Sequence, residues 1–131
     1  MTYKNNFINQ LMSGGNKWKS EKIFLKTLKI IQKSQKLQSN VLLKFAIINS
    51  SPYFDIKQVQ KKKKKSIEFP FLLNETLRIS YSIKNIVKFR NKNLYVQLLD
   101  SVENQGAGVN LKTNLHKEAF LKKKVSNYRW F

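Results

Sequence analysis

The chain of 131 residues contains no cysteine and a single histidine, His116. The absence of cysteine excludes a disulfide framework, a thiolate metal site and a cysteine nucleophile. One histidine is too few for a histidine-based metal site. No apolar run approaches the roughly 18 residues that a membrane span requires, so we expect no membrane partner. The segment 1–9 has neither the apolar core of a signal peptide nor the Arg-rich pattern of an imported presequence.

Acidic residues are also scarce, with 7 Asp and Glu in total. They form no Asp-x-Asp pair, and the spacing of Asp100 and Glu103 is common on solvated helices. Gly14–Lys17 lacks the Gly-Lys-Ser/Thr ending of a phosphate loop, and Gly106–Gly108 lacks the preceding strand of a dinucleotide fold. We therefore predict that the chain is not an enzyme and has no catalytic residue, no metal site and no cofactor.

Positive charge is what the chain has in excess. It carries 26 Lys and Arg, a formal net charge of +19 and a pI of about 10.3. The charge is spread as +8 over residues 1–44, +7 over 45–90 and +4 over 91–131. Hydrophobic residues make up 41% of the chain, enough for one folded domain spanning 1–131. A whole domain with this imbalance repels itself, which predicts a polyanionic partner.

Apolar spacing predicts a mainly α fold, an approximately six-helix bundle-like domain with one protruding β-hairpin. The expected helices lie at about 7–12, 17–36, 39–49, 75–90, 94–102 and 109–127, and the hairpin arm at about 54–71. Residues 77–83 also alternate like a strand, but the length of the segment favours a helix. We expect Gly106 to cap the fifth helix in the left-handed conformation. The hairpin has no Gly or Asn for a tight turn, which predicts a long loop.

The side chains expected to face the core follow from the same spacing. In the second helix they are Phe24, Leu28 and Ile31; in the third, Val41, Leu42, Phe45 and Ala46; in the last, Leu111, Leu115, Leu121 and Val125.

Lysines recur every three or four residues along the second predicted helix. This lysine stripe consists of Lys19, Lys22, Lys26, Lys29, Lys33 and Lys36. A solvated helix face usually mixes both signs, whereas here only Glu21 offsets the lysines. The stripe therefore favours docking of an anion over a plain solvated face.

Other cations gather at the predicted hairpin tip, Lys61–Lys65, and on the last helix. The last helix carries Lys112, His116, Lys117, Lys123 and Lys124. Lysines bind phosphates without reading bases, and only 3 of the 26 basic residues are Arg, so we expect recognition of the shape of a folded RNA. Tyr128 and Trp130 either stack on a base or pack the last helix against the body.

Two blocks of residues carry a resemblance to a known family. The first consists of Phe7–Met12, Gly15, Lys17, Glu21–Ile23 and Leu28. The second consists of Glu103–Gly106, Val109, Lys112, His116, Ala119, Lys123 and Tyr128–Trp130. In order and spacing they resemble the seventh protein of the small ribosomal subunit, in its organellar form.

The resemblance implies a mostly helical fold with a protruding hairpin in the head of the small subunit. It implies binding to the 3′ major domain of the small-subunit rRNA, a role in assembly, and proximity to exit-side tRNA and mRNA. The partners would be this rRNA and neighbouring ribosomal proteins of the head and platform. The family is Arg-rich before the fourth helix, where this chain reads Leu72–Glu75 and leaves Arg78 as the nearest cation.

Together these arguments define a set of predicted site residues. The predicted rRNA-binding residues are Lys17, Lys19, Lys22, Lys26, Lys57, Lys61, Lys62, Lys63, Lys64, Lys65, Arg78, Lys112, His116, Lys117, Lys123 and Arg129, with Tyr128 and Trp130 as stacking or partner contacts. The alternative function is a free-standing basic architectural protein on nucleic acid. The 23 Lys, 14 Asn and 11 Ile have AT-rich codons, which indicates an AT-biased genome such as an organellar one. Together with the resemblance, this predicts a mitochondrial, organelle-encoded protein, with a plastid protein less favoured.

Overall fold

The computed structural model of the chain describes residues 3–61, 65–89 and 93–125. The elements in chain order are α1 (Tyr3–Leu11), α2 (Lys17–Ser34), α3 (Ser39–Ser50), β1 (Phe54–Lys61), β2 (Lys65–Leu72), α4 (Glu75–Lys88), α5 (Leu94–Val102), α6 (Ala107–Leu121) and the 3-10 turn η2 (Lys123–Val125). The predicted mainly α fold with one antiparallel hairpin is confirmed.

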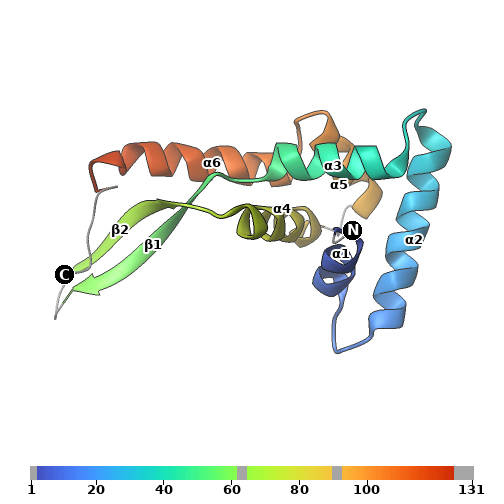
Figure 1. Cartoon of the computed structure of the whole chain (residues 1–131), viewed down its shortest axis with the longest axis horizontal. Coiled ribbons are helices and arrows are strands. Elements are labelled where there is room, and N and C mark those ends of the chain that lie inside the picture. Colours follow the sequence, from blue (N-terminus) through green and yellow to red (C-terminus); the bar gives the residue numbers. More distant parts are fainter. Residues whose placement is uncertain (1–2, 62–64, 90–92, 126–131) are drawn as a thin grey trace.

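The molecule is elongated, with α2 at one end and the hairpin at the other (Figure 1). Helices α3 and α6 run along one long side, and α4 lies beside them (Figure 1). Helix α2 contacts α1, α3 and α5, so it closes the helical body. The hairpin extends from that body, but α6 contacts β1 and η2 contacts β2. Part of the arm is therefore covered by α6 and η2.

Helices α1 and α2 meet through stacked aromatic rings in the core. The ring centroids of Phe7 and Phe24 lie 5.5 Å apart, and both side chains are almost fully buried. Ile31 is buried on the same face of α2, about two turns beyond Phe24, and Leu28 packs against the same cluster. The predicted apolar line of α2 is thus confirmed. Each such side chain contributes about 1.5–3 kcal/mol on burial.

The buried face of α3 differs from the predicted one. Leu42 and Ala46 are buried as expected, but Leu43 and Ile47 are buried with them. The inward placement of Val41 and Phe45 is wrong, because both side chains are exposed. The segment 41–48 is apolar nearly all round, so its periodicity does not distinguish the face that meets α4 and α5.

Helix α6 also departs from prediction. It buries Gly108, Val109 and Ala119, whereas Leu121, expected inward, is 79% exposed. Leu111 and Leu115 are only partly buried, and the side chain of Val125 lies outside the described residues. The end of α6 runs along a two-stranded arm and not against the helical body, so few apolar neighbours are available there (Figure 1).

The connection between α5 and α6 uses two residues with positive φ. Asn104, at φ 60°, takes the left-handed position after α5, and the Gln105 amide then donates to the Asp100 carbonyl at 2.8 Å. Gly106, at φ 93° and ψ 176°, begins α6 as its N-cap. The prediction that Gly106 caps the fifth helix is wrong, because asparagine also tolerates that conformation.

The hairpin ladder continues into the lysine run. Its register pairs Phe54 with Leu72 and continues to a Lys61–Lys65 pair. The prediction of a long loop is therefore wrong, since only residues 62–64 separate the strands. Ladder hydrogen bonds join backbone groups, so lysine side chains do not end the pairing.

Substituting Gly106→Ala tests this connection. An added Cβ would lie 2.9 Å from the Asp100 Cβ, in a conformation that is essentially restricted to glycine. We expect the free energy of unfolding to fall by about 1–3 kcal/mol in urea titrations followed by circular dichroism.

The matched control is Gly108→Ala, two positions away inside α6. Its added Cβ would meet Ile86 and Ser50 at an ordinary 3.7 Å. We expect this variant to be neutral or slightly stabilised, because alanine favours the helix. Equal losses in both variants would show that the Gly106 conformation is not the cause.

Candidate nucleic-acid interface

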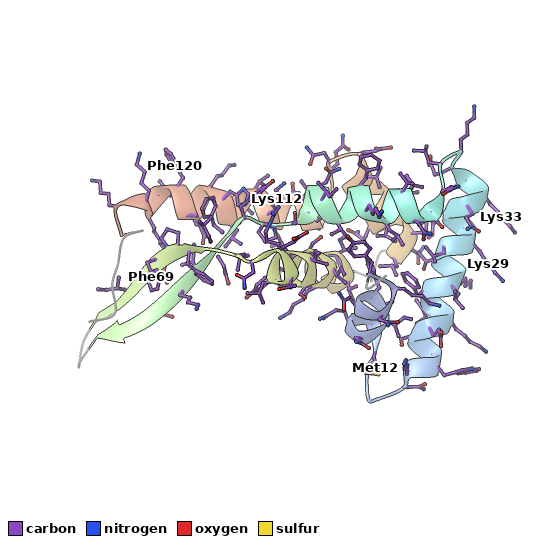
Figure 2. All side chains as sticks on the ribbon, in the orientation of Figure 1. Met12, Lys29, Lys33, Phe69, Lys112 and Phe120 are labelled. Carbon is purple, nitrogen blue, oxygen red and sulfur yellow. The ribbon has the colours of Figure 1, made fainter. Side chains whose placement is uncertain are left out.

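The lysine stripe lies on the side of α2 that faces away from the core. All six of its side chains are exposed, and Phe24 and Ile31 occupy the opposite side of the helix. Lys29 and Lys33 point away from the body (Figure 2). Lys36 lies two residues past the end of α2, and Lys17 is exposed at its first residue. The stripe is therefore accessible along the whole helix.

Acidic side chains do not neutralise this surface. The ion pairs of the described residues are Lys4 with Glu21, at 4.0 Å, and Lys122 with Glu68. Glu21, the acid within α2, thus pairs with α1 and not with the stripe. Asp55 accepts a hydrogen bond from the Tyr81 hydroxyl, which raises the pKa of Tyr81. The stripe keeps its positive charge uncompensated within the described part of the chain.

Cations on the hairpin are only partly described. Lys57 is exposed, and its Nζ lies 4.3 Å from the centroid of the Phe71 ring on the other strand. Lys61 and Lys65 face each other in the backbone register. Lys62–Lys64 lie outside the described residues, as do Tyr128, Arg129 and Trp130. Lys117 and Lys123 are exposed on the outer surface of α6 and η2.

Lys112, a predicted RNA contact, takes part in an internal joint. Its Nζ donates to the Asn49 carbonyl oxygen at 3.1 Å. The Asn49 amide in turn donates to the carbonyl oxygens of Ser101 and Val102, at 2.9 and 3.0 Å. Figure 2 shows Lys112 where α6 passes the end of α3. These bonds connect α3, α5 and α6, and sequence reasoning did not assign this function to Asn49.

His116 lies one turn further along α6 and also bonds internally. Its Nε2 accepts a hydrogen bond from the Tyr53 amide at 3.0 Å. Its ring lies 5.8 Å from the ring of Phe54, edge to face. Burial, followed by the nearby charges of Lys112 and Arg78, lowers the pKa of His116 below 6.5. A neutral imidazole suits this position, because Nε2 must be unprotonated to accept a hydrogen bond from the backbone N–H.

Arg78 completes the same region from α4. Its guanidinium carbon lies 3.8 Å from the centroid of the Tyr53 ring, and Nη2 donates to the Ser51 hydroxyl at 3.3 Å. Arg78, Lys112 and His116, which are far apart in sequence, thus converge where β1 begins. All three contact the segment that runs from the end of α3 to the start of β1, and their predicted RNA contacts remain a prediction.

Sequence reasoning also missed an aromatic residue beside the lysine stripe. Trp18 is 66% exposed, and the Lys22 Nζ lies 3.5 Å from the centroid of its ring. The signal was present, because residues four apart on a helix are neighbours.

Two other kinds of site are absent from the described residues. They contain no group of three His, Cys, Asp or Glu that could hold a metal ion. Within them, no helix is both long and apolar enough to cross a membrane.

A small helical body with a two-stranded arm and exposed, unpaired lysines is typical of ribosomal proteins. The particular family follows from comparison of the sequence with known families. Ribosomal protein S7p/S5e matches residues 2–123, and the chain belongs to that family. Proteins of this family are structural components of ribosomes. Both the resemblance and the prediction that the chain is not an enzyme are thereby confirmed.

Individual relatives are similar at low identity over nearly the whole chain. The small ribosomal subunit protein uS7 of Nitratiruptor sp. is 30% identical over 133 residues, covering 95% of this chain and 85% of the relative. The uS7m protein of Reclinomonas americana is 27% identical over 131 residues, covering 95% and 82%. The uS7 protein of Oleidesulfovibrio alaskensis is 24% identical over 132 residues, covering 95% and 84%.

The lowered pKa of His116 predicts a pH dependence of stability. The unfolded chain, with a histidine pKa near 6.5, binds a proton before the folded chain does. The contribution of His116 is therefore complete above that value and is lost below it, as the pH falls through the lower pKa of the folded state. We expect His116→Gln to reduce the loss of unfolding free energy between about pH 7.5 and about pH 5.5.

Urea titrations at the two pH values measure this difference. Lys117→Gln, on the exposed side of α6, is the control for introducing a glutamine at another position of the same helix. It should keep the wild-type pH dependence. An unchanged pH dependence in His116→Gln would show that another group is responsible.

Proposed function

We propose that this chain is a structural constituent of a small ribosomal subunit and that it binds the subunit's rRNA. The observation that carries the proposal is the lysine stripe, which is exposed along α2 and unpaired among the described residues. Membership of the ribosomal protein S7p/S5e family supports the same role. A surface of this kind gains free energy on RNA by releasing the counterions bound to phosphates.

The finer proposal concerns position in the subunit. The resemblance in both sequence blocks supports binding to the 3′ major domain in the head, where the protein aids assembly. It also supports a place beside exit-side tRNA and mRNA, with ribosomal proteins of the head and platform as neighbours. The opposite placement of α2 and the hairpin suits a protein that touches RNA on several sides (Figure 1).

The proposed rRNA contacts fall into accessible and internally bonded residues. Lys17, Lys19, Lys22, Lys26, Lys57, Lys117 and Lys123 are exposed and are the first to test. Arg78, Lys112 and His116 already hold internal bonds. Lysine retains two further donors at such a position, so Lys112 can serve both purposes.

We also propose a mitochondrial location. The similarity to the uS7m protein of Reclinomonas americana supports it, as does the abundance of amino acids with AT-rich codons. The bacterial relatives are similar to a comparable degree. Fractionation of mitochondria on a sucrose gradient tests it, because the chain should sediment with the small subunit.

Salt dependence tests the RNA-binding role of the lysine stripe. The test variant replaces Lys19, Lys26, Lys29 and Lys33 with Gln, and leaves Lys22 in place because it contacts Trp18. For every replaced lysine that contacts a phosphate, the slope of log K against log salt should become less steep by about 0.7–0.9. Filter binding to a transcript of the 3′ major domain measures this slope.

The matched control replaces the same four lysines with Arg, which keeps the charge and should keep most of the slope. An unchanged slope in the Gln variant would contradict phosphate contacts on α2. Equal affinity of the wild-type chain for a random duplex at moderate salt would instead favour a free-standing architectural protein.

The hairpin tip provides an independent prediction. Replacing Lys61–Lys65 with Ser should weaken binding to the same transcript, because up to five phosphate-binding charges are removed. Helical content should be retained, since the helices pack around a separate core. Loss of the helical circular dichroism signal would show that the tip is needed for folding.

A further inference from the structure

Trp18 is a large aromatic side chain at the surface of a helix that has a well-packed core face. It lies in the first turn of α2, after Asn16, whose side chain accepts the Lys19 amide and fixes the start of the helix. Phe24 and Ile31 supply the buried side of α2, and Trp18 is 66% exposed. Trp18 therefore contributes little to holding α2 on the body.

The surroundings of Trp18 are cationic. Lys17 and Lys19 flank it in sequence, and the Lys22 ammonium lies 3.5 Å from its ring centroid. The nearby acid, Glu21, is paired with Lys4 on α1. An apolar ring within uncompensated positive charge is poorly suited to a purely hydrophobic partner surface, because the lysines would have to be desolvated with it.

The same arrangement suits single-stranded nucleic acid. Proteins hold unpaired bases by stacking them on aromatic rings while nearby cations bind the phosphates. The Lys22 ammonium covers one part of the ring, and the large exposed fraction of Trp18 leaves further ring surface accessible. A base stacked on this ring would place its phosphates near the start of the lysine stripe.

We infer that Trp18 is a stacking platform for an unpaired base of the bound RNA, with Lys19 and Lys22 on the adjoining phosphates. The inference rests on the proposed rRNA binding and adds a kind of contact that lysines do not provide. Lysines bind duplex and single strand alike, whereas an accessible ring selects a base that is free of its partner. The start of α2 would therefore dock at a loop or bulge.

Intrinsic fluorescence tests the platform directly. The chain has two tryptophans, Trp18 and Trp130, so Trp130→Phe leaves Trp18 as the one tryptophan, which is excited selectively at wavelengths where tyrosine does not absorb. In this background we expect strong quenching when a transcript of the 3′ major domain is added. A blunt RNA duplex without unpaired bases should produce little quenching. Quenching that is equal with both RNAs would overturn the inference.

Affinity separates stacking from charge. Trp18→Leu keeps an apolar side chain but removes the ring, and should weaken binding to the transcript about 5- to 150-fold. The slope of log K against log salt should stay the same, because no charge changes. Trp18→Tyr keeps an aromatic face and should retain most of the affinity. The exposure of Trp18 predicts an unchanged circular dichroism spectrum for both variants.

The result also separates this inference from the proposed function. If Trp18→Leu binds as well as wild type while Lys19→Gln flattens the salt slope, the chain binds RNA but Trp18 is not a platform. Quenching by other ribosomal proteins without any by RNA would likewise overturn the platform and indicate a protein contact. Failure of the wild-type chain to bind the transcript would instead overturn the proposed function.

Discussion

The hydrogen bonds of Asn49 join α3, α5 and α6 at the end of the helical body from which the arm extends. Its side-chain amide donates hydrogen bonds to the last two carbonyl oxygens of α5, and its backbone carbonyl oxygen accepts a hydrogen bond from the Lys112 ammonium of α6. Four residues after Lys112, His116 accepts a hydrogen bond from the backbone amide of Tyr53, just before β1. With few acids available for ion pairs, these bonds to backbone groups and the rings of Tyr53 and Phe54 orient the hairpin. The arm therefore leaves the body from the segment that these bonds hold.

Local pattern was sufficient to predict the elements but not their contacts. The period of Phe24, Leu28 and Ile31 identifies α2 and its buried side, because one side of that helix is apolar and the other is cationic. In α3 the apolar residues surround the helix, and the buried face is chosen by neighbours that are distant in sequence. The exposure of Leu121 has the same origin, since the length of the body beside α6 is not encoded in α6.

The residues of the candidate site likewise fall into those that local sequence predicts and those whose contacts depend on distant residues. The lysine stripe could be predicted because its spacing and its lack of acids are both local. The internal roles of Lys112 and His116 could not, because their partners lie 63 positions away. Arg78 likewise meets Ser51 across 27 positions. The sequence around a basic residue does not show whether its side chain will bind a carbonyl oxygen, an aromatic ring or a phosphate. That choice depends on which groups the fold brings close to it.

The separation of α2 from the hairpin along the molecule has a kinetic consequence. On an RNA that contacts both ends, binding of one end makes binding of the other intramolecular, at an effective concentration set by the span between them. Release then requires both ends to detach together, so residence time grows much more than either contact alone would give. Such a protein holds two RNA elements at a fixed distance from each other, while each separate contact stays weak enough to dissociate and form again.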